Sequence, residues 1–420
     1  MHKESAGRVD TEKYPVETTI NLQGHLLDSN IFSQVLGTVY DLDGEIEVLD
    51  LKVGKTKEDI SYAKIRVFAK SNHELQHILD VIQKYGARIA DVEDAELAAS
   101  PADFVFPDGF YSTTHHRTYV KYHGEWLEVK NIEMDKGITI KGGEACCVPL
   151  SKVKKGDLFV VGTKGIRVRP PERPRKRSVF EFMASGVSSE RPVKSYAEAI
   201  GREMERLKKN SGKIVFVAGP AIIHAGARDS LAELIKLGYV DALLAGNALA
   251  VHDLEASLFG TSLGVNLKTT QPMEGGHRHH LVTINEMRKI GSIKKAVDQG
   301  VIKDGVMYEL IKKNVPFVLA GSIRDDGPLP EVITDTLKAQ DKMRENLKNA
   351  DLVIMLASTL HSIATGNMLP SWVKTICVDV NPAVVSKLMD RGTQQAIGVV
   401  SDVGAFLPLL VQVLKKRECL

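Results

Sequence analysis

Four consecutive residues, Ser358 to His361, and one acid, Asp379, have types and a spacing that suit nucleotide chemistry. They follow two apolar runs, Leu352 to Leu356 and Thr375 to Val378, of the kind that forms buried parallel strands. A dinucleotide fold places its ribose-binding carboxylate about 20 residues after the phosphate loop. Ser358 and Asp379 are 21 positions apart (379 − 358), but no G-x-G-x-x-G is present. We expect a dinucleotide site without the common phosphate loop; an ordinary doubly wound sheet is the alternative.

Small and polar residues also stand where other apolar runs of the C-terminal half end. One edge of a parallel sheet collects such strand ends, and small residues there let backbone N–H groups approach a pyrophosphate. Asp379 is best placed for ribose hydroxyls, and its charge would repel a 2′-phosphate, so NAD is favoured over NADP. The alternative is that each strand end is an ordinary helix cap. The strand ends are 219–220, 246–248, 322–327, 358–361, 379–381 and 401–404.

The segment QPMEGGHRHH, residues 271–280, brings together a second set of reactive side chains. Arg278 can grip a carboxylate through two parallel hydrogen bonds, and His277 or Glu274 can transfer protons near neutral pH. Neighbouring histidines also occur in metal tracts, but no second ligand cluster accompanies these. We expect a substrate loop; a surface loop that precedes a helix over 282–296 is the alternative.

These strand ends can meet only if residues 191–420 fold as a doubly wound α/β domain. Apolar runs of strand length alternate there with helical patterns, which indicates a parallel sheet covered on both faces. About six strands fit a Rossmann-like dinucleotide-binding domain. The strand candidates are KIVFVAGP, DALLAGNA, VPFVLAGS, LVIMLAS, KTICVDV and AIGVVSDVG.

Two smaller domains are expected ahead of the α/β domain. Residues 1–99 show the order β-α-β-β-α-β, the ferredoxin-like arrangement, which by itself says little about chemistry. Residues 100–190 contain short strand candidates punctuated by glycines and predict a small β-rich domain. The basic, proline-rich segment 170–177 is typical of a solvated linker.

Composition argues against several other classes of protein. The chain has 420 residues, 43% hydrophobic and 26% charged, which suits two or three packed domains. A net charge of +2 gives no reason to expect nucleic acid or an anionic membrane as a partner. No apolar run reaches the length of a membrane span and the polar N-terminus lacks a signal core, so we expect a cytoplasmic protein. Four cysteines without a C-x-x-C pair indicate neither a metal site nor a disulfide framework.

Several blocks of the chain resemble one known family. GHLLDSNIF is similar to the conserved region named after the bifunctional lysine-ketoglutarate reductase/saccharopine dehydrogenase. FVAGPAIIHAG, AGNALAVHDLE, MEGGHRHH, SIRDDGPLPEV and STLHSIATGNMLPSWVKTICVDVNP resemble the archaeal-type NAD-dependent ornithine cyclodeaminases. They also resemble the C-terminal module of the cyanobacterial arginine dihydrolase/ornithine cyclodeaminase proteins. The resemblance runs from Val16 to Leu410.

The resemblance implies an enzyme of proline biosynthesis and arginine/ornithine metabolism. It would convert L-ornithine to L-proline and ammonia through transient hydride transfer to bound NAD, in a nucleotide domain similar to that of deoxyhypusine synthase. Arg278 would hold the substrate carboxylate, and Glu274 and His277 would move protons. Asp325 is the alternative residue for proton transfer. The cofactor-contact candidates are Asn247, Ala248, Asp325, Ser358, Thr359, Leu360, His361, Asp379, Asp402 and Val403.

The same residues leave two other functions open. An NAD-linked amino-acid or saccharopine-type dehydrogenase would release NADH, whereas a non-catalytic NAD or amino-acid sensor would bind without turnover. The sequence carries no dihydrolase domain ahead of the module, so arginine is not an expected substrate. We expect L-ornithine and a second copy of the chain, in a homo-oligomer, as the partners.

Overall fold

The computed structural model describes residues 13–24, 26, 30–54, 59–89, 93–169, 193–390 and 396–418. The chain divides into two compact units, residues 1–177 with 370–372 and residues 178–369 with 373–420. The expected linker at 170–177 and the expected boundary at 190 lie outside the described residues. Among the described helices, none has the length and apolar character that crossing a bilayer requires.

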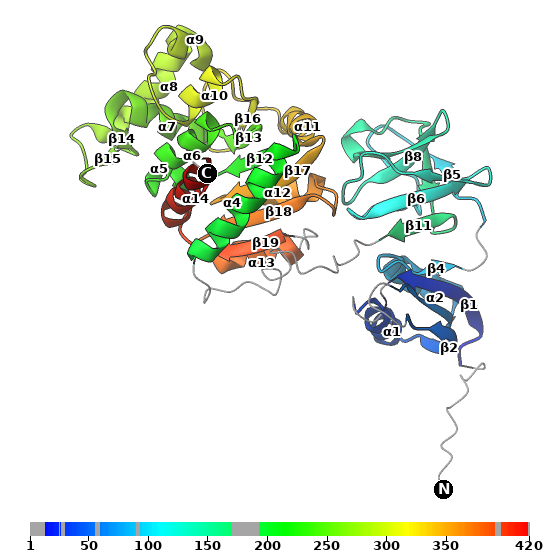
Figure 1. The fold of residues 1–420 in the computed structure, drawn as a ribbon. Helices are drawn as coiled ribbons and strands as arrows, with labels where there is room; N and C mark the ends of the chain where they lie inside the picture. The colour runs from blue at the N-terminus through cyan, green and yellow to red at the C-terminus, as the bar shows by residue number, and fades with distance from the viewer. Residues whose placement is uncertain are drawn as a thin grey trace. The chain divides into compact units, whose positions relative to one another are not determined.

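The first part of unit 1 is the expected ferredoxin-like sheet with two helices (Figure 1). Its strands lie in the order β2-β3-β1-β4, and every neighbouring pair is antiparallel. Ile20 and Leu22, alternate residues of β1, are buried against Val35 of α1 and Ile78 of α2. The elements are β1 (Val16–Gly24), α1 (Ile31–Asp41), β2 (Glu45–Lys52), β3 (Ser61–Ala69), α2 (Asn72–Gln83) and β4 (Arg88–Ile89).

The second part of unit 1 is β-rich and contains two antiparallel sheets, ordered β5-β10-β8-β9 and β11-β6-β7. Strand β5 pairs with β10, so it belongs to this part, although the expected boundary put residues up to 99 in the first part. The elements are β5 (Glu96–Ala99), β6 (Arg117–Tyr122), β7 (Glu125–Glu128), β8 (Gly137–Lys141), β9 (Glu144–Val148), η1 (Leu150–Lys152), β10 (Leu158–Val161) and β11 (Ile166–Arg169).

Unit 2 is built on a parallel sheet of six strands in the order β16-β13-β12-β17-β18-β19. Counted along the chain from β12, this order is 3-2-1-4-5-6, the order of dinucleotide-binding Rossmann domains. The expected α/β architecture is therefore confirmed. The strands are β12 (Lys213–Ala218), β13 (Ala242–Gly246), β16 (Phe317–Ala320), β17 (Ala350–Leu356), β18 (Lys374–Asp379) and β19 (Ala396–Val400).

Helices cover both faces of this sheet. The helices are α4 (Val193–Lys209), α5 (Ala221–His224), α6 (Arg228–Lys236), α7 (Asn247–Phe259), α8 (His279–Ile290), α9 (Ile293–Asp298), α10 (Val306–Lys312), α11 (Thr336–Leu347), α12 (Leu360–Met368), α13 (Pro382–Asp390) and α14 (Val403–Glu418). Residues of β12 alternate between two cores: Ile214 and Phe216 pack with α4, α7 and α14, whereas Val215 and Val217 pack with α11 and α13. This alternation is why the strand reads as a continuous apolar run.

The helix expected over 282–296 is two helices, α8 and α9. Gly291 ends α8 with a φ of 96°, in the left-handed region that favours glycine. Ser292 then begins α9, because its side-chain oxygen accepts the Lys295 N–H over 3.0 Å. The apolar periodicity continued through this break, so the pattern alone predicted one helix.

Candidate active site

The structure brings the expected strand-end residues to one edge of the parallel sheet. Each follows, or ends, a parallel strand at its carboxyl end. Asn247 and Ala248 follow β13, Asp325 follows β16, residues 358–361 follow β17, Asp379 ends β18, and Asp402 and Val403 follow β19. We call this edge, with these residues, the rim. Ligands of open α/β sheets bind at such an edge, where the strand order reverses.

The strand order reverses between β12 and β17, and there the backbones approach closely. The Gly219 N–H donates to the Leu356 carbonyl over 2.9 Å. A Cβ atom on Gly219 would lie 1.8 Å from the carbonyl oxygen of Ala357, so no side chain fits. Ala357 itself has a φ of 46°. The next helix, α12, begins after Thr359 without a side-chain cap, so its first N–H groups donate to no side chain of the described residues. Small residues and an uncapped helix start suit a pyrophosphate.

Asn247 and Asp325 join two of the rim loops. The Asn247 Nδ2 donates to Asp325 Oδ1 over 2.9 Å, and its Oδ1 accepts the Leu329 N–H over 3.2 Å. The other Asp325 oxygen accepts the Ser322 N–H over 2.8 Å. Both carboxylate oxygens of Asp325 are thus engaged, which suits a residue that fixes the loop better than a proton carrier.

His361 lies over Gly246 at the start of α7. A Cβ atom on Gly246 would be 2.8 Å from the Cε1 atom of His361, so the missing side chain makes room for the imidazole. Burial lowers the pKa of His361, which keeps the ring neutral near pH 7. A neutral imidazole can both donate and accept a hydrogen bond at the rim.

Two acids stand at the other side of the rim. Asp379 is 8% exposed, and its Oδ1 accepts the Asn381 N–H over 2.8 Å. No further hydrogen bond reaches its carboxylate from the described residues, so Oδ2 can accept one from a ligand. Asp402 Oδ1 accepts the Gly404 N–H over 2.7 Å at the start of α14. Asp402 therefore acts as a helix cap, the alternative that the sequence left open for every strand end.

The substrate-loop candidates lie on the surface. Glu274, His277 and Arg278 are exposed, on and beside the short turn η2 (Gly276–Arg278). No ion pair or side-chain hydrogen bond joins them to the rim among the described residues. Their loop packs on a hairpin of β14 (Thr261–Ser262) and β15 (Val265–Asn266), where Gly276 meets Gly264 so closely that neither could carry a Cβ. Among all the residues that the structure describes, no three His, Cys, Asp or Glu side chains lie together as a metal site would require.

A buried polar network beside this loop was missed by the sequence reasoning. Glu255, fully buried on α7, accepts hydrogen bonds from Thr261 Oγ1 over 2.8 Å and from the N–H groups of Leu263 and Gly264. The His252 ring lies 3.3 Å from it, Nδ1 to Oε2. Burial would raise the pKa of Glu255, but these hydrogen bonds outweigh it and lower the pKa, so the group is a carboxylate.

The network extends through histidines to three further elements. The rings of His224, on α5, and His252 lie 4.7 Å apart, edge to face. His224 Nδ1 lies 2.7 Å from Ser262 Oγ, and His279 Nδ1 lies 2.8 Å from Thr261 Oγ1. Burial, followed by the charge of His252, lowers the pKa of His224. A histidine oriented by a carboxylate can transfer protons, and α5 and α7 both begin at the rim.

The sheet order and the rim define a Rossmann-type nucleotide-binding protein, and the comparisons place the chain more closely. The family described as "Arginine dihydrolase ArgZ-like, C-terminal, Rossmann fold" matches residues 198–410, and its "first region" matches 117–197. The "LOR/SDH bifunctional enzyme conserved region" matches 17–116. The chain belongs to this ArgZ-like C-terminal family.

Named relatives and solved structures agree with this family. The ornithine cyclodeaminase of Archaeoglobus fulgidus is 59% identical, over 95% of this chain and 98% of that protein. A crystal structure of a LOR/SDH protein from Methanococcus maripaludis S2 is 54% identical, with a TM-score of 0.74 over 78% of this chain and 100% of that one. The ternary complex of AgrE with ornithine and NAD+ is 42% identical, with a TM-score of 0.53 over 96% of this chain and 58% of that one.

Proposed function

We propose that this chain is an ornithine cyclodeaminase that converts L-ornithine to L-proline and ammonia and uses bound NAD. The rim at the reversal of the strand order carries the proposal, because it brings the strand-end residues that we expect to contact a dinucleotide to one edge of the sheet. The named activity of the archaeal relatives and the complex of AgrE with ornithine and NAD+ support it.

The rim residues fit NAD in three respects. The side-chain-free contact between Gly219 and Ala357 and the uncapped start of α12 suit the pyrophosphate. The free Oδ2 atom of Asp379 suits ribose hydroxyls, and its charge disfavours a 2′-phosphate. His361 and the Asn247–Asp325 pair line the neighbouring strand ends. The cofactor supplies reversible hydride transfer, so the reaction as a whole leaves it unchanged.

The chain's own groups bind the amino acid and move protons. Arg278 offers an exposed guanidinium, without a partner among the described residues, to the ornithine carboxylate. Glu274 and His277 flank it and are one candidate set for proton transfer. The buried pair His252 and Glu255 is the second set, because its hydrogen bond orients the imidazole. Placing the reacting groups together is the main contribution of the protein.

We also propose a cytoplasmic homo-oligomer in which a second copy covers the rim. Three large apolar residues stand exposed there: Ile323 after β16, Leu360 at the start of α12 and Val380 after β18, which are 106%, 77% and 71% exposed. Apolar side chains exposed on one edge indicate a surface that another molecule covers.

The decisive experiment is incubation of the purified chain with L-ornithine and NAD. We expect proline and ammonia in equal amounts and no accumulation of NADH. The absorbance of the reduced nicotinamide would reveal any NADH that is released. Accumulating NADH would instead identify an amino-acid or saccharopine-type dehydrogenase. Binding of NAD without proline formation would identify a sensor.

A further inference from the structure

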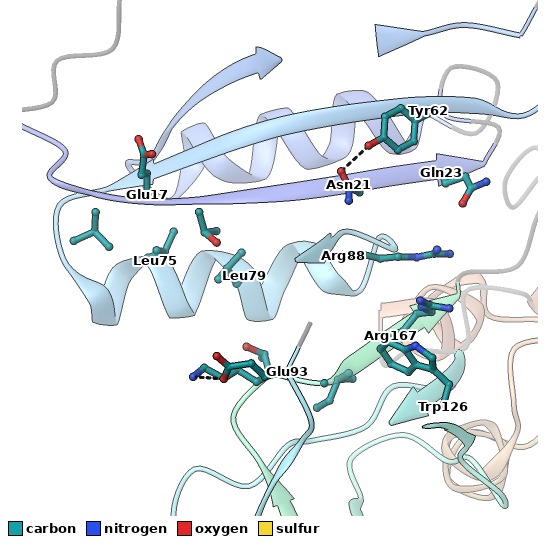
Figure 2. Close-up of a pocket in the computed structure, with 16 residues that line it drawn as sticks. Glu17, Asn21, Gln23, Tyr62, Leu75, Leu79, Arg88, Glu93, Trp126 and Arg167 are labelled. Atoms are coloured by element: carbon teal, nitrogen blue, oxygen red, sulfur yellow. Dashed lines mark hydrogen bonds and ion pairs between the residues drawn. The ribbon is translucent and has the colours of Figure 1, made fainter. Parts of the chain in front are cut away.

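Unit 1 contains a cavity of about 410 Å³, a volume that suits a small molecule. One wall comes from the ferredoxin-like sheet and the other from the β-rich part, as Figure 2 shows. The two walls are joined by a buried hydrogen bond, in which the Gln83 Nε2 donates to the Thr163 carbonyl over 3.1 Å. Gln83 and Thr163 are 2% and 3% exposed, so the cavity is a fixed feature of the unit.

Two arginines lie at one end of this cavity, Arg88 from β4 and Arg167 from β11, with neighbouring guanidinium groups (Figure 2). The Nε atoms of both are buried and have no hydrogen-bond partner. Within the described ranges, neither arginine forms an ion pair with a carboxylate. Burial, followed by the charges of Arg167 and Arg169, lowers the pKa of Arg88. Two half-buried cations that repel each other, and that no carboxylate of the described residues pairs with, are costly unless a ligand supplies negative charge.

The carboxylates along the same cavity already have partners. Glu17 lies 3.7 Å from Arg66 Nε, and Glu93 lies 3.1 Å from Lys164 Nζ. Glu17 and Glu93 both lie away from the end where Arg88 and Arg167 meet (Figure 2). Among the described residues, no carboxylate therefore compensates the positive charge at that end.

The remaining groups at the arginine end are arranged as donors. The Tyr62 hydroxyl donates to Asn21 Oδ1 over 2.8 Å, which leaves the Asn21 Nδ2 to donate elsewhere. The Arg167 guanidinium lies 4.1 Å over the ring of Trp126, a contact that fixes its plane. Guanidinium groups held in a plane, beside an amide donor, match the oxygens of a carboxylate.

We propose that this cavity binds a small dicarboxylate, with its charged groups on Arg88 and Arg167. Two guanidinium groups that pair with no carboxylate in the described ranges match a ligand of two negative charges. Past the arginines the cavity continues along Leu75, Leu79 and Ile166, which gives room for a carbon chain that inorganic phosphate lacks. The site lies in unit 1, apart in sequence from the rim, and its test needs neither NAD nor ornithine.

The fluorescence of Trp126 reports on the site directly. The chain has two tryptophans, so Trp372→Phe leaves Trp126 as the single reporter. We expect malonate, succinate or glutarate to change its emission saturably at constant ionic strength, and Arg88→Gln or Arg167→Gln to weaken binding at least about tenfold. Arg117→Gln is the matched control, because this exposed arginine already pairs with Glu128 over 2.8 Å; we expect less than about a twofold change.

A second readout separates a ligand site from a structural one. Removing either cavity arginine relieves repulsion in the free protein, so Arg88→Gln and Arg167→Gln should melt at the same temperature as the parent or higher. Added dicarboxylate should raise the melting temperature of the parent but not of these variants. No saturable binding of any dicarboxylate, unchanged binding in both variants, or tighter binding of inorganic phosphate would each overturn the proposal.

Discussion

Asn247 and Asp325 are joined side chain to side chain over 2.9 Å, although 78 residues separate them in the chain. Asn247 begins the helix after β13, and Asp325 lies in the loop after β16, so the bond links neighbouring strand ends. Asn247 also accepts the Leu329 N–H, and its side chain is almost fully buried. One amide thus holds the loop that borders the rim, with both its donor and its acceptor in use.

Asn247→Ala should therefore destabilise unit 2 and loosen the loop after β16. The substitution leaves a buried N–H and a carboxylate oxygen without their partner, which costs about 1–3 kcal/mol. Chemical denaturation measures the loss. Asn346→Ala is the control, because Asn346 is half-buried and its Nδ2 donates to the Lys342 carbonyl over 2.9 Å in an exposed hydrogen bond. This substitution should change stability by less than about 0.5 kcal/mol. Equal stability of the two variants would show that the Asn247–Asp325 bond does not contribute to the stability of unit 2.

Gly219→Ala tests the close approach at the reversal of the strand order. The new Cβ would meet the Ala357 carbonyl oxygen at 1.8 Å, and because that oxygen belongs to the backbone, the strands must separate. We expect a loss of about 3 kcal/mol or more, or failure to fold, together with loss of NAD binding. Gly327→Ala, where nothing lies within 4 Å, should be close to the parent. A Gly219→Ala protein that folds and binds NAD normally would remove this contact from the phosphate site.

The rim was predictable from the sequence, whereas the buried network was not. Asn247 and Asp379 could be placed because a parallel sheet gathers strand ends at one edge whatever the details of packing. His252 and Glu255 are hidden within the apolar pattern of α7, and Thr261 reaches Glu255 only through a turn that the pattern does not specify. Two polar residues three positions apart, His252 and Glu255, inside such a buried helix were the available signal.

Asp379→Asn tests the choice of cofactor. The amide can still accept the Asn381 N–H, but the charge that disfavours a 2′-phosphate is gone. We expect NAD to bind about tenfold more weakly and its preference over NADP to fall by a similar factor. Titration calorimetry with both nucleotides measures this. Asp351→Asn is the control: Asp351 caps the other end of the sheet by accepting the Lys213 N–H over 2.9 Å, and NAD affinity should not change. The same preference in Asp379→Asn would exclude a ribose role.

Arg278→Ala tests the substrate loop. If Arg278 holds the ornithine carboxylate, kcat/KM should fall about a hundredfold while NAD binding stays intact, because a charge-assisted hydrogen bond pair is lost. Lysine at this position should restore part of the activity, since it keeps the charge without the planar fork. Arg288→Ala, near the end of α8, removes a bond to the Pro328 carbonyl over 2.9 Å and should retain activity. Full activity of Arg278→Ala would move the carboxylate site elsewhere.

Glu255→Gln distinguishes between the two candidate sets for proton transfer. The stability that the variant loses relative to the parent should also depend on pH. The pKa of Glu255 is lower in the folded protein than in the unfolded chain, where a Glu titrates at about 4.3. Its carboxylate therefore stabilises the fold above the unfolded pKa, and this stabilisation is lost as the pH falls through the folded pKa. At pH 7 the variant should be about 1–3 kcal/mol less stable than the parent, and the gap should close on acidification.

Activity gives the second half of this test. If His252 and Glu255 transfer protons, Glu255→Gln should lower kcat and shift the acidic limb of the pH–rate profile, with NAD affinity unchanged. His277→Asn, in the exposed loop, should then leave that limb in place. The opposite pattern, a shifted profile in His277→Asn and a parent-like profile in Glu255→Gln, would assign proton transfer to the loop and leave the buried network a structural role.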